Sequence, residues 1–138
     1  MDEPSEIRLG DYLVRVDGDV LHCRADGEAT AEIAHGLVRL LGQIQARHGR
    51  FFIIGDLKDA GTVGPVARRI FIDFSARHAP LAVAFYRVNL MARGVNALLI
   101  AAANLLSKQR HNVRQFSTEQ EARSWIGAER RRLVKPEP

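Results

Sequence analysis

The sequence predicts a single α/β domain with a mixed, partly parallel sheet and elements in the order ββαβαβαβα. Apolar runs of strand length at 51–57 and 81–86 indicate strands buried on both faces, and a helical pattern follows each of them. The length of 138 residues, 46% of them hydrophobic, suits one core. We expect a disordered N-terminus over 1–6, the domain over 7–133 and a tail over 134–138.

The first elements follow from local patterns. Short β-favouring runs at 12–16 and 20–24 flank an Asp-Gly pair, which predicts an antiparallel hairpin. Apolar residues then recur at three- and four-residue steps after Thr30, which indicates a helix. This helix is expected to end near His48, because Gly49 suits a left-handed cap.

The central strand, 51–57, is the feature around which the other elements are arranged. We expect it to end in a glycine-rich loop over 58–64, and Pro65 fits the first position of the next helix. Since ligands of open α/β sheets bind outside the carboxyl ends of strands, this loop is the expected functional edge. In the helix, Ile72 is predicted to point away from an apolar stripe of Val66, Ala67, Ile70, Phe71 and Phe74.

A third helix is predicted after Asn89, which suits its N-terminal cap. Its outward face holds little charge for a surface helix, which indicates contact with a partner; Arg93, Asn96 and Ile100 lie on that face. An edge strand is expected over 112–116. A final helix should begin after Thr118, because Thr118 and Glu121 match a capping box.

The composition excludes several classes of protein. The formal charge is +4, but much of the excess lies in 130–135 without interleaved aromatic residues, so we expect no nucleic-acid binding. Cys23 is the only cysteine, which excludes an internal disulfide and suits a reducing cytoplasm. We expect neither a signal peptide nor an integral membrane segment, since the longest nearly uncharged stretch, 94–107, is too short to span a bilayer.

Three features together resemble a STAS-type domain: the opening hairpin, a strand ending in Asp56-Leu57, and the ending FSTEQEARSWI from Phe116 to Ile126. The family includes anti-sigma factor antagonists and stand-alone bacterial proteins similar in fold to lipid-binding CRAL-TRIO domains. The resemblance implies a non-catalytic regulatory role. Kinase-regulated members carry a serine phosphate acceptor after the central strand, but here no serine lies between Asp56 and Phe74, and Thr62 is the only nearby hydroxyl.

Groups capable of chemistry are sparse. The histidines are scattered and never paired with a cysteine or an acid at metal-ligand spacing, so we predict no metal site and no cofactor. Asp56 and Asp59 bracket Lys58, a spacing that suits an acid and base pair or a bound cation. An acid at the end of a central strand more commonly accepts hydrogen bonds from the following loop.

The sequence therefore predicts a non-catalytic regulatory or protein-interaction module whose partner is another protein or a second copy of the chain. The predicted partner surface comprises Lys58, Asp59, Thr62, Arg68, Arg69, Ile72, Arg93, Asn96 and Ile100, with Thr62 also a candidate phospho-acceptor. One alternative is a carrier of a lipid or small apolar ligand, which the resemblance to CRAL-TRIO domains suggests. The other is an enzyme that uses Asp56 or Asp59.

Overall fold

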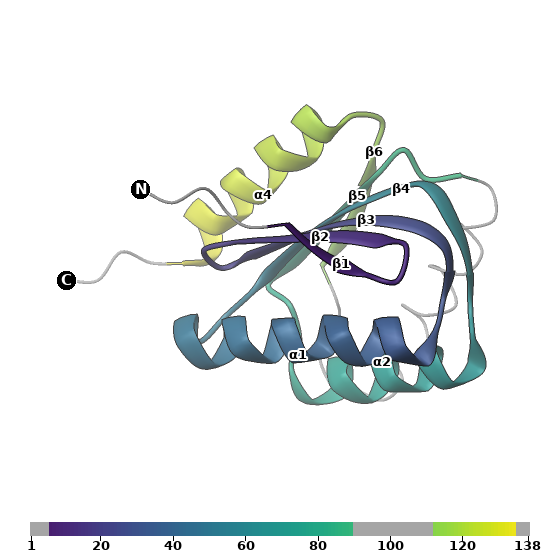
Figure 1. The fold of residues 1–138 in the computed structure, drawn as a ribbon. Coiled ribbons are helices and arrows are strands. Elements are labelled where there is room, and N and C mark those ends of the chain that lie inside the picture. Colours follow the sequence, from purple (N-terminus) through teal and green to yellow (C-terminus); the bar gives the residue numbers. More distant parts are fainter. Residues whose placement is uncertain (1–5, 90–111, 135–138) are drawn as a thin grey trace.

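The computed structural model describes residues 6–89 and 112–134, which form a six-stranded sheet with helices on both faces (Figure 1). The strands are β1 (Glu6–Leu9), β2 (Tyr12–Asp17), β3 (Val20–Ala29), β4 (Phe52–Val63), β5 (Ala82–Tyr86) and β6 (Val113–Phe116). The helices are α1 (Ala31–His48), α2 (Pro65–Arg77) and α4 (Glu119–Leu133). Strand order follows chain order: β1, β2 and β3 pair antiparallel, and β3 to β6 pair parallel. The predicted α/β class with a mixed sheet is confirmed.

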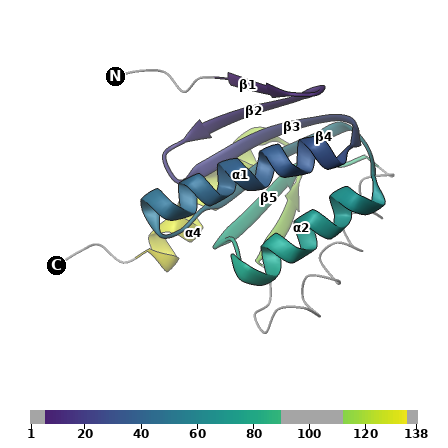
Figure 2. The same ribbon diagram turned by 60° about the horizontal axis from the view of Figure 1, so that its bottom comes forward.

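Two hydrophobic layers enclose the sheet. Helices α1 and α2 lie on one face and α4 lies on the other (Figures 1 and 2). Phe51 and Phe52, both fully buried, enter opposite layers: Phe51 packs with α1 and α2, and Phe52 packs with Ala122 and Ile126 of α4. The central strand is therefore buried on both sides, as its continuous apolar run predicts.

The helix ends follow the predicted capping chemistry. The hydroxyl of Thr30 accepts a hydrogen bond from the Ile33 amide at 3.3 Å, and Gly49 adopts a left-handed conformation at the end of α1. At the start of α4, Thr118 and Glu121 form the reciprocal bonds of a capping box. These side chains satisfy amide groups that would otherwise lack partners at the helix ends.

Strand β1 was not predicted, and Glu6 lies in it rather than in a disordered terminus. The four residues of β1 alternate between exposed and half-buried, and they pair with β2 from Glu6 opposite Arg15 to Leu9 opposite Tyr12. Leu9 packs against the core beneath α1. A run of four residues is too short for its alternation to stand out in the sequence, so the strand depends on pairing with β2.

The predicted loop over 58–64 is wrong, because β4 continues as a strand to Val63. It remains paired with the second half of β3, which itself runs beyond its predicted end through two register shifts (Figures 1 and 2). A Cβ atom on Gly61 would lie only 2.8 Å from the carbonyl carbon of Gly27. The glycines that suggested a loop instead permit close approach of two backbones. We call residues 58–63 the β4 extension.

The predicted apolar stripe of α2 needs two corrections. Val66 is 60% exposed, whereas Ile72, expected to point outward, is buried at 9% exposure. Ala67 and Phe74 face the core as predicted. The burial of Ile72 makes the covered surface of α2 wider than the predicted stripe, and α2 also packs against α1.

Several predictions lie outside the described residues. They concern the third helix with Arg93, Asn96 and Ile100, disorder over 1–5, and the tail over 135–138. Asn89, the predicted cap of that helix, is described, and its side-chain amide donates to the carbonyl oxygens of Leu57, Lys58 and Ala60 at 2.9–3.1 Å. Within 6–89 and 112–134, no helix has both the length and the apolar character needed to cross a bilayer.

Candidate functional site

Side chains of the central strands alternate between the two faces of the sheet. In β5, Ala84 and Tyr86 pack with α4, whereas Val83 and Phe85 point toward α1 and α2. In β4, Ile54 lies on the α4 side and Ile53 on the opposite side. The surface of the sheet beneath α1 and α2 is therefore formed by every second residue of β3, β4 and β5.

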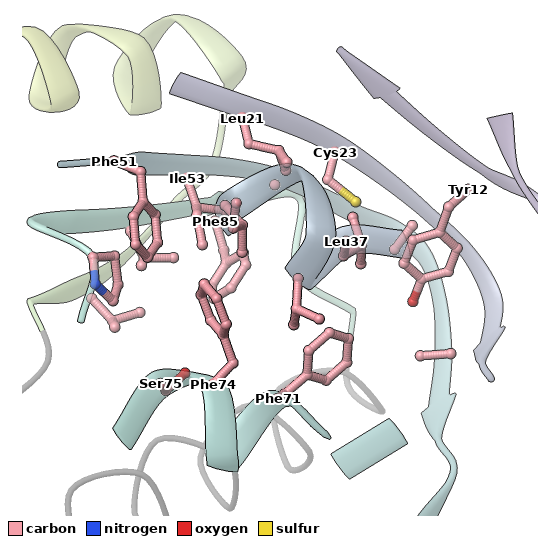
Figure 3. A pocket seen from close by; sticks show the side chains of 18 of the residues that line it. Tyr12, Leu21, Cys23, Leu37, Phe51, Ile53, Phe71, Phe74, Ser75 and Phe85 are labelled. Carbon is pink, nitrogen blue, oxygen red and sulfur yellow. The ribbon is translucent and has the colours of Figure 1, made fainter. Parts of the chain in front are cut away.

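A pocket of about 230 Å³ lies between this surface and the two helices; we call it the apolar pocket (Figure 3). Strands supply most of its wall, α1 contributes Leu37, Val38 and Leu41, and α2 contributes Phe71, Phe74 and Ser75. The strand and connecting residues that line it are Tyr12, Leu21, Cys23, Ala25, Ala29, Phe51, Ile53, Gly55, Leu57, Val63, Pro80, Val83, Phe85 and Val113. Almost all of this lining is apolar, which suits an apolar occupant.

Aromatic rings and small residues give the apolar pocket its shape. The rings of Phe51 and Phe74 lie 5.9 Å apart in a tilted pair, and Figure 3 shows them together with Phe85 around the interior. Gly55 faces the same space, and a Cβ atom there would lie 2.8 Å from the Phe85 ring. Glycine at this position lets the ring lie against the strand and leaves the interior open.

Three polar side chains line the apolar pocket: Tyr12, Cys23 and Ser75. Burial, with a smaller contribution from the Asp56 charge, raises the pKa of the Cys23 thiol to about 12. Burial also raises the pKa of Tyr12. No hydrogen bond to another described residue involves any of the three side chains. The pocket thus offers neutral groups that can orient a ligand, but no thiolate at physiological pH.

Asp56 follows Gly55 in β4 and belongs to the other face of the sheet. It is 3% exposed, and its Oδ1 accepts hydrogen bonds from the Lys58 amide at 3.1 Å and from Arg87 Nε at 3.2 Å. Its Oδ2 pairs with Arg87 Nη2. Arg87 adopts a left-handed backbone conformation, with φ of 54°, directly after β5. This ion pair ties the end of β5 to the point where the β4 extension begins.

The two candidate catalytic acids have different environments. Asp56 is buried and both of its oxygens are engaged, whereas Asp59 is exposed on the β4 extension opposite Asp26 of β3. Three hydrogen bonds from Lys58 and Arg87 already engage the Asp56 carboxylate, which favours a structural role for Asp56 over proton transfer. Catalysis by Asp56 or Asp59 stays a prediction, and this arrangement gives it little support.

The predicted partner surface is only partly assembled in the described residues. Lys58, Asp59 and Thr62 are exposed on the β4 extension, and Arg69 is exposed on α2, where it pairs with Asp73 at 3.3 Å. The Nε of Arg68 is instead buried without a hydrogen-bond partner among residues 6–89 and 112–134, and Ile72 is buried. Thr62 remains accessible as a phospho-acceptor candidate, and its modification stays a prediction.

The sequence predicts buried strands over 51–57 and 81–86 and an apolar helix stripe that includes Phe71 and Phe74, so these residues were interpreted as core and the apolar pocket was not predicted as a site. Phe71 and Phe74 occur at helical spacing, which is typical of ordinary core packing. The available clue was the small residues on the same face: Ala25 and Ala29 of β3 and Gly55 of β4. Small side chains leave an open volume only if the helices lie far enough from the sheet. The spacing of residues along the chain does not indicate the distance between helix and sheet.

No group of three histidine, cysteine, aspartate or glutamate side chains in the described part of the chain is arranged to hold a metal ion. The predicted absence of a metal site and of a cofactor therefore stays a prediction for the chain as a whole. The chemistry that the apolar pocket supports is hydrophobic burial with hydroxyl hydrogen bonds.

No protein-family profile and no curated protein matches the sequence. Among solved structures, the chain is similar to an uncharacterised protein of the DUF3478 family from Shewanella loihica PV-4, which has a SpoIIAA-like fold. The two chains share 16% identity with a TM-score of 0.60, over 90% of this chain and 92% of the other. This likeness shows the fold: the chain has a SpoIIAA-like, that is STAS-like, architecture, as the sequence resemblance implied.

Proposed function

We propose that this SpoIIAA-like chain is a non-catalytic binding protein that takes a small apolar molecule into the apolar pocket. The observation that supports this function best is the pocket itself, about 230 Å³ with an almost wholly apolar lining. Water in such a space would find few hydrogen-bond partners, so replacing it with an apolar ligand is favourable.

The volume limits the size of the ligand. Engineered apolar cavities of about 150 Å³ bind benzene, whereas pockets for drug-sized ligands occupy about 300–1,000 Å³. The apolar pocket lies between these limits. We infer a ligand of two fused rings or a short alkyl chain, with the Tyr12 or the Ser75 hydroxyl available to a polar group.

Cys23→Phe is expected to abolish this binding. The Cys23 side chain projects from β3 into the apolar pocket, so a phenyl group there would occupy the space that the ligand needs (Figure 3). Naphthalene, followed by ligand-observed NMR, is a suitable probe, and we expect its affinity to fall by at least about tenfold, or 1.4 kcal/mol. The variant should remain folded because the added ring fills existing space rather than displacing packed atoms.

Cys23→Ala is the matched control, since it removes the same thiol and leaves the pocket open. Naphthalene binding should be retained by Cys23→Ala and lost by Cys23→Phe, with circular dichroism confirming that both are folded. Equal affinity in the two variants would show that the ligand lies elsewhere. A native mass spectrum of the protein purified from its own host would then identify any natural adduct.

A second candidate function, protein interaction, is supported by the exposure of Val66. This side chain is 60% exposed at the start of α2, and Lys58, Asp59 and Thr62 of the preceding β4 extension are exposed as well. The exposed residues from Lys58 to Val66 combine apolar and charged side chains, a composition that suits contact with a partner. The partner would be another protein or a second copy of the chain, and such contact is compatible with a regulatory role.

Lys58→Glu combined with Val66→Asp is expected to weaken that association at least about tenfold without changing the fold. Both side chains are exposed, and such substitutions usually change stability by less than about 0.5 kcal/mol each. Light scattering measures self-association, and a pull-down from host extract measures a foreign partner. Arg47→Glu on the exposed side of α1 is the control; association unchanged in the double variant would count against this surface.

A further inference from the structure

A polar groove of about 280 Å³ lies on the α4 side of the sheet, opposite the apolar pocket. We call it the arginine groove; its charged and polar lining includes Arg15, His22, Arg24, Tyr86, Glu119 and Arg123. Helix α4 packs on β4, β5 and β6. The groove lies at the edge of α4, next to β2 and β3 of the same sheet face. We propose that the arginine groove binds a small oxyanion, a carboxylate or a phosphate.

The charges in the groove leave two arginines available. Arg87 is engaged by Asp56, and Arg123 pairs with Glu119 at 2.8 Å. Arg15 and Arg24 form no ion pair with any described residue, although Glu6 lies opposite Arg15 in the β1–β2 register. Two unpaired guanidinium groups in one concavity favour an anionic ligand.

Arg15 gives the strongest indication of a missing partner. Its Nε is buried and has no hydrogen-bond partner in the described structure. A buried, unsatisfied donor costs free energy, and more so on a charged group. An oxyanion in the arginine groove would accept a hydrogen bond from Arg15 Nε and offset part of the free-energy cost of burying the guanidinium charge.

Tyr86 and Glu119 hold the opposite wall in position. The Tyr86 hydroxyl donates to Glu119 Oε1 at 2.9 Å, and Glu119 Oε2 accepts from Arg123 Nε at 2.8 Å. Two bonds to one carboxylate restrict its rotation and orient the Arg123 guanidinium. The remaining N–H groups of Arg123, whose side chain is 43% exposed, are available to a ligand.

His22 lies in the arginine groove among charges from two other elements. Arg15 and Asp17 face it from β2, and Arg123 and Glu119 face it from α4. Burial, together with the two arginines, lowers the pKa of His22 to about 4, so the imidazole is neutral at pH 7. A bound oxyanion would offset the arginine charges and raise the pKa of His22. Anion binding should therefore be accompanied by proton uptake in mildly acidic solution.

The experiment is an NMR titration of the whole chain with inorganic phosphate and, separately, with succinate, at constant ionic strength set by chloride. Constant ionic strength prevents general screening from imitating binding. We expect a saturable shift of the His22 ring resonances and a rise in the pKa of His22. Arg15→Gln and Arg123→Gln should each weaken anion binding at least about tenfold, whereas Arg39→Gln, an equal charge change on the exposed side of α1, should leave it unchanged.

Each outcome decides the proposal. Binding of both anions supports a general oxyanion site, and binding of one alone supports the site and identifies its class. No saturable shift with either anion, or equal weakening in Arg15→Gln, Arg123→Gln and Arg39→Gln, overturns it. If Arg15→Gln does not fold, Arg123→Gln still decides, because that side chain is half exposed. Naphthalene binding on the other face tests the apolar pocket independently.

Discussion

Asp19→Ala is expected to lower the free energy of unfolding by about 3 kcal/mol. Asp19 is 6% exposed in the turn between β2 and β3, and its carboxylate accepts hydrogen bonds from Arg50 Nε at 2.9 Å and from Arg130 Nη2. Arg50 precedes β4 and Arg130 lies near the end of α4, so one side chain joins three elements. The arginines are 35% and 40% exposed and regain water on substitution, which places the loss at the lower end of the range for a buried pair.

Asp17→Ala is the matched control for this substitution. Asp17 lies two residues earlier at the same turn, is exposed, and forms no ion pair within the described structure. Urea denaturation should place Asp17→Ala within about 0.5 kcal/mol of the wild type. Equal losses in the two variants would mean that the ion pairs of Asp19 do not stabilise the fold.

Acidification from pH 6.5 to about 4 is expected to remove about 2–3 kcal/mol of stability through His22 alone. The folded state holds the pKa of His22 at about 4, whereas the unfolded chain has the ordinary value of 6.5. Well above pH 6.5 the imidazole is neutral in both states. As the pH falls, the unfolded state binds the proton first, so stability is lost through this window and the loss levels off below pH 4.

Urea denaturation at a series of pH values measures this effect, and His22→Gln should flatten the curve between pH 6.5 and 4.5. Two acids contribute at lower pH. Hydrogen bonds from Tyr86 and Arg123 lower the pKa of Glu119 below 4.5, and for Asp19 the bonds to Arg130 and Arg50 outweigh burial and lower the pKa below 3.8. Their stabilisation is present above those values and is lost below them. Parallel curves for wild type and His22→Gln above pH 4.5 would contradict the assignment.

The fold was largely predictable because its strongest features are local. The apolar run at 51–54 predicts a strand buried on both faces, and Thr118 with Glu121 predicts the start of α4. The errors arose where pairing between strands overrides local preference. Gly61 suggests a loop in the sequence, but in the structure it permits close pairing of β4 with β3. Strand β1 forms because it pairs with β2.

The sites were less predictable because both depend on distances between elements. Cys23 and Phe74 are separated by 50 residues of chain, and nothing local indicates that they line the same pocket. Likewise, Arg15 and Arg123 have the pattern of ordinary surface charges in the sequence, and only the packing of α4 on the sheet brings them to one groove. The predicted surface at Lys58, Asp59 and Thr62 was located from an expected loop, and those residues are exposed for a different reason, as part of an extended strand pair.

Because side chains alternate along β3, neighbouring residues of this strand belong to different sites, the apolar pocket on one face of the sheet and the arginine groove on the other. His22 belongs to the arginine groove, while Leu21 and Cys23, the residues on either side of it, line the apolar pocket. Inserting one residue before Leu21 would exchange the two sets, sending imidazole into the hydrophobic side and thiol toward the arginines. Inserting two would restore the original assignment. Tolerance of this strand to length changes should therefore depend on whether the change is odd or even.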